Sequence, residues 1–103
     1  MNLQGKKINF LGDSITFGYG LGNSCDRFAD LIAQRYGAIS RNYGISGTRI
    51  ARQTTPSDDP SHDLDFPSRV AEMDPDADIV VVFGGTNDYG HGDAPLGTMA
   101  DRT

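Results

Sequence analysis

Residues 77–85 read ADIVVVFGG, a run of five large apolar residues between an aspartate and a pair of glycines. Four of the five are β-branched, which favours a strand. Every position in the run is apolar, so both faces of the strand must be covered. Such strands are typical of parallel sheets with helices packed on each side. This segment therefore predicts a fold in which parallel strands and helices alternate.

Two further strands and two helices fit the same alternation. We expect strands at residues 7–12, KINFLG, and 39–44, ISRNYG. A helix is predicted within residues 25–37, because large apolar side chains recur there at helical spacing and a glycine follows them. These side chains are Phe28, Leu31, Ile32 and Tyr36. A shorter helix is predicted within residues 65–78, with Pro67 near its start and Asp74-Pro75 beyond its end. The order strand, helix, strand, helix, strand is that of an α/β fold.

The remaining segments show no regular pattern. Residues 53–65, QTTPSDDPSHDLD, are polar and contain two prolines, so they predict a surface loop. Residues 89–103 have no strong periodicity, and the chain contains no internal repeat. We therefore expect one domain, since 103 residues leave no room for a second core.

The composition excludes several classes of protein. A net charge of −5 argues against nucleic acid or an anionic membrane as the main partner. Cys25 is the sole cysteine, so neither an internal disulfide nor a thiolate metal site is expected. The apolar run near the N-terminus is too short for a signal peptide, and no segment approaches the roughly 20 apolar residues of a membrane span. We therefore expect a cytoplasmic protein.

Glycine-rich polar clusters follow all three predicted strands. They read GDSIT at residues 12–16, NYGISGT at 42–48 and GGTND at 84–88. In parallel α/β sheets, ligands bind outside the carboxyl ends of the strands, which meet at one edge. The three clusters are therefore expected to lie together and to form a site.

The serine of the first cluster allows several interpretations. Taken alone, Ser14 after Gly12-Asp13 is typical of a helix cap or a turn residue. A phosphate-binding P-loop is excluded, because no Lys-Ser or Lys-Thr follows the glycines. The dinucleotide fingerprint fails on glycine spacing. The nucleophile elbow of α/β-hydrolases fails because Thr16 stands where its second glycine should be.

Taken together and in order, GDSIT, NYGISGT and GGTND resemble the first three sequence blocks of the SGNH hydrolases, also called the GDSL esterase/lipase family. The resemblance extends from about residue 7 to residue 90. It implies a three-layer α/β/α fold similar to flavodoxin, with a parallel sheet, and ester hydrolysis through a serine nucleophile. Residues 1–103 would then be the N-terminal portion of a single hydrolase domain.

The resemblance also implies a role for one residue in each block. Ser14 would be the nucleophile that forms an acyl-enzyme. Its backbone N–H, the backbone N–H of Gly47 and the side-chain amide of Asn87 would form the oxyanion hole. Taken singly, Gly47 could instead be a turn glycine and Asn87 a turn residue in the left-handed conformation.

Four polar neighbours of these positions are interpreted as structural. We expect Asp13 and Asp88 to organise their own turns through local hydrogen bonds. Asn42 and Ser46 are expected to act in the same way.

The general base of the family comes from a fourth block, Asp-x-x-His, near the C-terminus. The sequence ends at Thr103, before such a block is expected. One literal match, DPSH at residues 59–62, lies between the second and third blocks and is interpreted as plain loop surface. His91 is likewise interpreted as an exposed loop residue. We therefore expect these 103 residues alone to be inactive, marginally stable and prone to self-association through an uncovered sheet edge.

The leading hypothesis is therefore a serine esterase for a small or carbohydrate-linked acyl ester, with no metal and no organic cofactor. A second hypothesis is a non-catalytic module that binds an acyl group or a carboxylate in the same cleft. A third is a flavodoxin-like binder of phosphate or nucleotide, which the scarcity of basic residues in the clusters, Arg49 excepted, disfavours.

Overall fold

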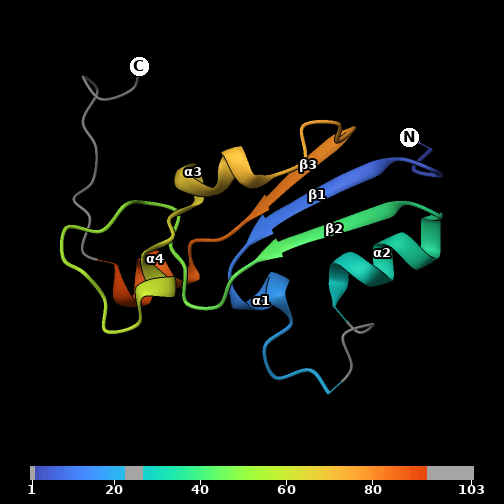
Figure 1. The fold of residues 1–103 in the computed structure, drawn as a ribbon. Helices are drawn as coiled ribbons and strands as arrows, with labels where there is room; N and C mark the ends of the chain where they lie inside the picture. The colour runs from blue at the N-terminus through green and yellow to red at the C-terminus, as the bar shows by residue number, and fades with distance from the viewer. Residues whose placement is uncertain (1, 23–26, 93–103) are drawn as a thin grey trace.

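The computed structural model describes residues 2–22 and 27–92 and contains a parallel sheet of three strands. These are β1 (Lys7–Gly12), β2 (Ile39–Gly44) and β3 (Ile79–Phe83), in the spatial order β2-β1-β3 (Figure 1). In register, Ile8 of β1 lies beside Ser40 on one side and Ile79 on the other. The three predicted strands and their parallel arrangement are confirmed.

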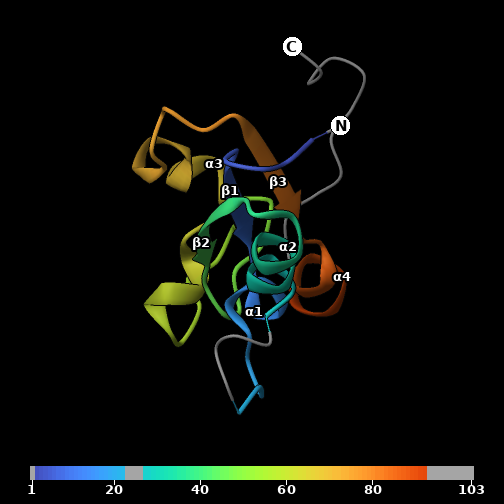
Figure 2. The same ribbon diagram turned by 90° about the vertical axis from the view of Figure 1, so that its right-hand side faces the viewer.

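Helices connect and follow the strands. They are α1 (Ser14–Phe17), α2 (Phe28–Tyr36), α3 (Phe66–Arg69) and α4 (Thr86–His91), with the short 3₁₀ turns η2 (Pro60–Asp63) and η3 (Val70–Glu72). Figure 2 shows α2 and α3 on opposite sides of the sheet, so the predicted layers of an α/β/α fold are present. No helix in the part of the chain that the structure describes is long and apolar enough to cross a membrane.

The core lies between β1 and α2. Ile8 and Phe10 of β1 are buried against Ala29, which has no exposed surface, and the ring of Phe28 meets Phe10 edge to face at 5.6 Å. The helix was predicted to bury Leu31 and Tyr36, but both are half-exposed. The buried face is instead centred on Ala29, with Phe28 and Ile32, also predicted to face the core, partly buried beside it.

The other face of β1 is covered by α3. Leu11 and Asn9 point to this side and are buried, as are Phe66 and Arg69 of α3. The predicted single helix of residues 65–78 is therefore a short α-helix followed by a 3₁₀ turn. Asp65 caps its first turn by accepting a hydrogen bond from the Ser68 N–H at 3.2 Å.

Strand β3 lies at the edge of the sheet and is only partly covered. Val80, Val82 and Phe83 are 51%, 58% and 49% exposed, although all three are large and apolar. The expectation that both faces of this strand are buried therefore does not hold within the described residues. Its outer edge and its Val80–Val82 face leave apolar surface in contact with water.

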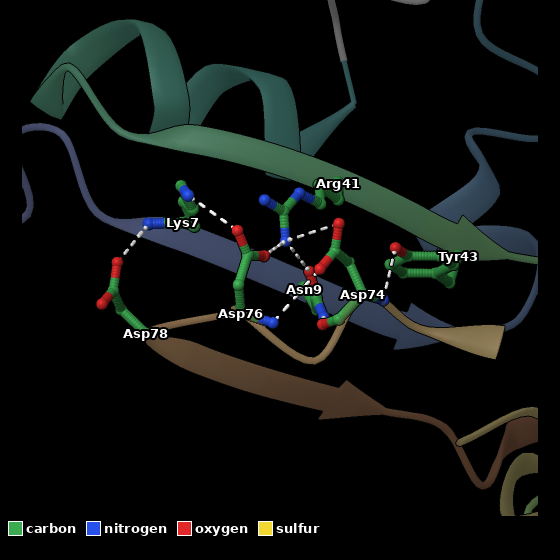
Figure 3. A network of polar contacts seen from close by, with 7 residues as sticks. All are labelled: Lys7, Asn9, Arg41, Tyr43, Asp74, Asp76 and Asp78. Atoms are coloured by element: carbon green, nitrogen blue, oxygen red, sulfur yellow. Dashed lines mark hydrogen bonds and ion pairs between the residues drawn. The ribbon is translucent and has the colours of Figure 1, made fainter. Parts of the chain in front are cut away.

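A network of charged residues ties the start of the sheet together (Figure 3). The Asp76 carboxylate, in the turn before β3, binds Arg41 Nη1 at 2.6 Å and Lys7 Nζ at 2.7 Å. The same turn accepts a hydrogen bond from Asn9 Nδ2 through the Asp74 carbonyl at 2.9 Å. Hydrogen bonds from Arg41 and then from Lys7 hold the pKa of Asp76 well below its usual range.

This network predicts a loss of stability in acid. Because the pKa of Asp76 is depressed in the folded state, its contribution is present above the ordinary aspartate value and is lost as the pH falls below about 4. We expect the urea midpoint of the protein to fall less between pH 7 and pH 3 in Asp76→Asn than in the wild type. Asp58→Asn, which removes an exposed carboxylate of the 53–65 loop, is the control and should behave as wild type. An unchanged acid dependence in Asp76→Asn would contradict this assignment.

Candidate active site

The carbonyl of Gly12, at the end of β1, joins the first two sequence clusters. It accepts hydrogen bonds from the Ile45 N–H at 3.1 Å, from Arg69 Nη2 at 3.2 Å and from Thr48 Oγ1 at 3.5 Å. These donors come from the segment after β2 and from α3. The backbone two residues before Ser14 is therefore fixed to the segment that contains Gly47.

Ser14 is the first residue of α1 and is partly exposed. The cap of this helix is Asp13, whose buried side chain accepts a hydrogen bond from the Ile15 N–H at 3.0 Å. The interpretation of Ser14 as a helix cap is therefore wrong, whereas the local role expected of Asp13 is confirmed. Within residues 2–22 and 27–92, neither the hydroxyl nor the backbone N–H of Ser14 has a hydrogen-bond partner.

Gly47 lies in the turn after β2 with a φ of +79°, a conformation that favours glycine. Its backbone N–H also has no acceptor in the part of the chain that the structure describes. A Cβ at this position would overlap the imidazole ring of His62. Glycine is therefore required here both by the backbone conformation and by the side chain packed on it.

Asn87 lies in the first turn of α4, and its side-chain amide donates to the Thr48 carbonyl at 2.9 Å. The left-handed conformation considered for it is excluded, since all described residues with positive φ are glycines. One amide N–H is used in this bond, and among the described residues the second has no acceptor. The third cluster is thereby held against the second.

Asp88 also ties the third cluster to the segment that follows the second cluster, although the two are distant in sequence. Its two carboxylate oxygens accept hydrogen bonds from the backbone N–H groups of Ile50 at 2.8 Å and Ala51 at 3.0 Å. The expectation of a purely local role for Asp88 is therefore wrong. Asn42, in contrast, is structural as expected, because it donates to the Thr16 carbonyl at 2.7 Å and accepts from the Gly44 N–H at 2.9 Å.

Two residues expected to be structural or peripheral behave differently. The Ser46 hydroxyl is buried and has no hydrogen-bond partner among the described residues. His91 ends α4 rather than lying in a loop, and its side chain lies outside the described part of the chain, as does all of Cys25.

Arg69 is the functional-site residue that sequence reasoning missed. It is buried under the site, donates from Nη1 to the Tyr43 carbonyl at 2.7 Å, and donates from Nη2 to Gly12 and to Thr48 Oγ1 at 3.0 Å. Its guanidinium also lies 5.1 Å from the centre of the Phe66 ring. Burial lowers the pKa of Arg69. One side chain thus holds the ends of β1 and β2 to the turn that contains Gly47.

We expect Arg69→Met to lower the free energy of unfolding by about 1–3 kcal/mol, because the Tyr43 carbonyl would lose its donor in a buried place. Urea unfolding measures this. Arg69→Lys, which keeps a donor, should recover part of the loss, and the exposed Arg35→Met should have no effect. A loss in Arg69→Met no larger than in Arg35→Met would show that Arg69 is not the clamp described.

A cavity of about 600 Å³ opens beside the second and third clusters. It is lined by Gly47 and Asn87 and by residues of the 49–62 segment, including Asp59 and His62. Ser14 is not among the lining residues. The Asp59–His62 match, interpreted from its place in the sequence as plain surface, therefore lies on the wall of this cavity.

Comparison with known proteins gives the family. Residues 10–102 match the GDSL-like lipase/acylhydrolase family. The chain belongs to this family. No match to a curated protein was found.

Several solved structures share the fold of this GDSL-like chain. One crystal structure is 31% identical, with a TM-score of 0.76, and the match covers 98% of this chain and 45% of that one. A protein from Lactobacillus plantarum is 36% identical, with a TM-score of 0.71 and coverage of 95% and 42%. AlinE4, described as an SGNH-hydrolase family esterase, is 26% identical, with a TM-score of 0.61 and coverage of 89% and 46%. The GDSL-like chain thus spans less than half the length of each.

Proposed function

We propose that this protein is a serine ester hydrolase and that residues 1–103 are the N-terminal portion of its single catalytic domain. One observation carries the proposal. The backbone N–H groups of Ser14 and Gly47 lack acceptors among the described residues, and hydrogen bonds through Gly12, Thr48 and Asn87 hold their segments together. Family membership and the likeness to AlinE4 support the same class of reaction.

In the proposed reaction, Ser14 Oγ attacks the carbonyl carbon of an ester and loses its proton to a general base. The carbonyl oxygen becomes an oxyanion, which the N–H groups of Ser14 and Gly47 and the second amide N–H of Asn87 stabilise. Collapse of this intermediate breaks the bond to the alcohol, which leaves with a proton, and the acyl group stays on Ser14. Water then attacks the acyl-enzyme in the same way and releases the carboxylic acid.

The general base is proposed to come from an Asp-x-x-His block outside residues 1–103. The coverage of 45% and 42% of the matched structures supports this, because more than half of their length has no counterpart here. Without a base the serine hydroxyl is a weak nucleophile. The 103 residues alone are therefore proposed to hydrolyse esters poorly or not at all.

Labelling with a fluorophosphonate probe tests the proposed function, because the probe reacts with an activated serine. The full-length protein should be labelled, and mass spectrometry of its peptides should place the adduct on Ser14. The 103-residue chain should be labelled far more slowly. If the full-length protein binds acetate but takes no label, it is a binding module rather than an esterase, and labelling at another serine would reject the assignment of Ser14.

We also propose that the 103 residues alone self-associate through β3, whose Val82 is 58% exposed. Sedimentation velocity should show dimers or larger species for this chain at micromolar concentration. Val82→Lys should shift the distribution towards monomer, because it places a charge on the exposed face. Lys6→Ala, which lies outside the strands, is the control. An equally associated Val82→Lys chain would place the contact elsewhere.

A further inference from the structure

Thr48 has no exposed surface and directly follows Gly47, one of the proposed oxyanion donors. Its hydroxyl lies 2.7 Å from the Ile45 carbonyl and 3.0 Å from Arg69 Nη2. An arginine side chain only donates hydrogen bonds, so the hydroxyl accepts from Arg69 and its one proton is left for a carbonyl. This proton points mainly to Ile45, since the Gly12 carbonyl is farther away at 3.5 Å. The hydroxyl is therefore fixed in one orientation.

The bond from this hydroxyl to Ile45 closes the turn that contains Gly47. In residues 45–48, the Thr48 N–H also donates to the Ile45 carbonyl, at 3.4 Å. Gly47 is the third residue of this turn, and its φ of +79° is typical of that position in a type II turn. The backbone bond is long, whereas the hydroxyl bond to the same oxygen is short. The Thr48 hydroxyl therefore makes the better of the two bonds that hold the turn around the Gly47 N–H.

The backbone of the same residue holds the third cluster. The Thr48 carbonyl accepts the hydrogen bond from Asn87 Nδ2 at 2.9 Å. Because the two N–H groups of a side-chain amide lie in one plane, this bond also fixes the direction of the second N–H, which is the proposed oxyanion donor. A rotation of the Thr48 carbonyl would turn both N–H groups. The donors at Gly47 and Asn87 thus depend on one buried residue.

We propose that Thr48 is a positioning residue for the oxyanion hole, acting on Gly47 through its hydroxyl and on Asn87 through its carbonyl. Thr48 itself does not touch the ester, because it is buried and is not among the residues that line the cavity beside Gly47 and Asn87. The inference rests on the proposed esterase function, in which both donors stabilise the oxyanion. Loss of the hydroxyl should therefore slow the chemical step and leave substrate binding unchanged.

The kinetic test uses Thr48→Val in the full-length protein, because this substitution keeps the shape of the side chain and removes its hydroxyl. We expect kcat for p-nitrophenyl acetate to fall by about 10- to 100-fold, with KM within about twofold of the wild type. Thr48→Ser keeps the hydroxyl and should recover most of kcat. Thr16→Val is the matched control and should match the wild type, because Thr16 is equally buried but its hydroxyl has no partner among the described residues. A loss no larger in Thr48→Val than in Thr16→Val, or no recovery in Thr48→Ser, would overturn the proposal.

Fluorophosphonate labelling separates a positioning role from a loss of folded protein. It is measured at a temperature at which circular dichroism shows that Thr48→Val is fully folded. A merely structural role predicts the wild-type rate of labelling under these conditions. The positioning role predicts complete labelling with a rate constant lower by about 10- to 100-fold. Labelling of the folded variant at the wild-type rate would overturn the proposal.

A second measurement, by NMR of the wild type, needs neither an ester nor a variant. The hydroxyl proton of Thr48 and one side-chain amide proton of Asn87 should exchange slowly with water, and the other amide proton of Asn87 should exchange rapidly. Rapid exchange of the Thr48 hydroxyl proton would overturn the role of Thr48, even if Thr48→Val does not fold. Slow exchange of this proton in a wild type that takes no fluorophosphonate label would instead overturn the esterase function and leave the contacts of Thr48 standing.

Discussion

Ser14→Ala is expected to lower kcat for ester hydrolysis by the full-length protein by about 10⁴- to 10⁶-fold. The loss is large because no acyl-enzyme can form without the hydroxyl. The free energy of unfolding should change little, since Asp13 rather than Ser14 caps α1 and the hydroxyl has no partner within the described residues. Initial rates with p-nitrophenyl acetate and urea unfolding measure the two effects.

Ser46→Ala is the matched control for this substitution. It removes a hydroxyl from the second cluster that is buried and without a partner among the described residues. Activity and fluorophosphonate labelling should both survive in Ser46→Ala and both vanish in Ser14→Ala. Residual hydrolysis with saturation in Ser14→Ala, above about one per cent of wild type, would mean that another group is the nucleophile.

Asn87→Ala is expected to lower kcat by about 10²- to 10³-fold, the usual effect of removing one donor from an oxyanion hole. KM should change little, because the amide is proposed to bind the oxyanion more strongly than the ground-state carbonyl. The substitution also removes the hydrogen bond to the Thr48 carbonyl, so urea unfolding must be measured in parallel. Rates are compared at a temperature where both proteins are fully folded.

The control for Asn87 is Thr86→Ala, an exposed position at the start of the same helix. Its activity should match the wild type. Fluorophosphonate labelling of Asn87→Ala should also be slower, because the tetrahedral phosphorus species needs the same donors. A rise in KM with kcat unchanged would assign Asn87 to substrate binding rather than to the oxyanion hole.

The strands were predictable because their signals are local. The apolar runs that end at Gly12 and Phe83 and the weaker run that ends at Gly44 all occur as parallel strands. Helix α4 was missed because six residues that include Gly90 carry no helical periodicity and follow two glycines. The predicted face of α2 is confirmed at Phe28 and Ile32, which pack against the core, but not at Leu31 and Tyr36, because the buried face is centred on Ala29 and only packing reveals this.

The three sequence clusters of the candidate site were predictable, but the residues that hold these clusters together were not. Strand ends of a parallel sheet meet by topology, which is why GDSIT, NYGISGT and GGTND could be grouped. Arg69 looks like an ordinary surface cation in the sequence, and its burial depends on carbonyls of β1 and β2 that meet only in the fold. The packing of His62 on Gly47 was not predictable for the same reason, because the two residues are distant in sequence.

Several donors bind the Gly12 carbonyl, and this affects when the candidate site forms as the protein folds. Ile45 and Thr48 reach this one oxygen only when β1 and β2 have docked, and Arg69 reaches it only when α3 has packed on them as well. The segment that carries Ser14, the proposed nucleophile, is thus fixed to the turn that contains Gly47 only when these elements pack together. A nascent or partly opened chain therefore contains the same residues without the fixed backbone geometry on which the proposed nucleophile depends.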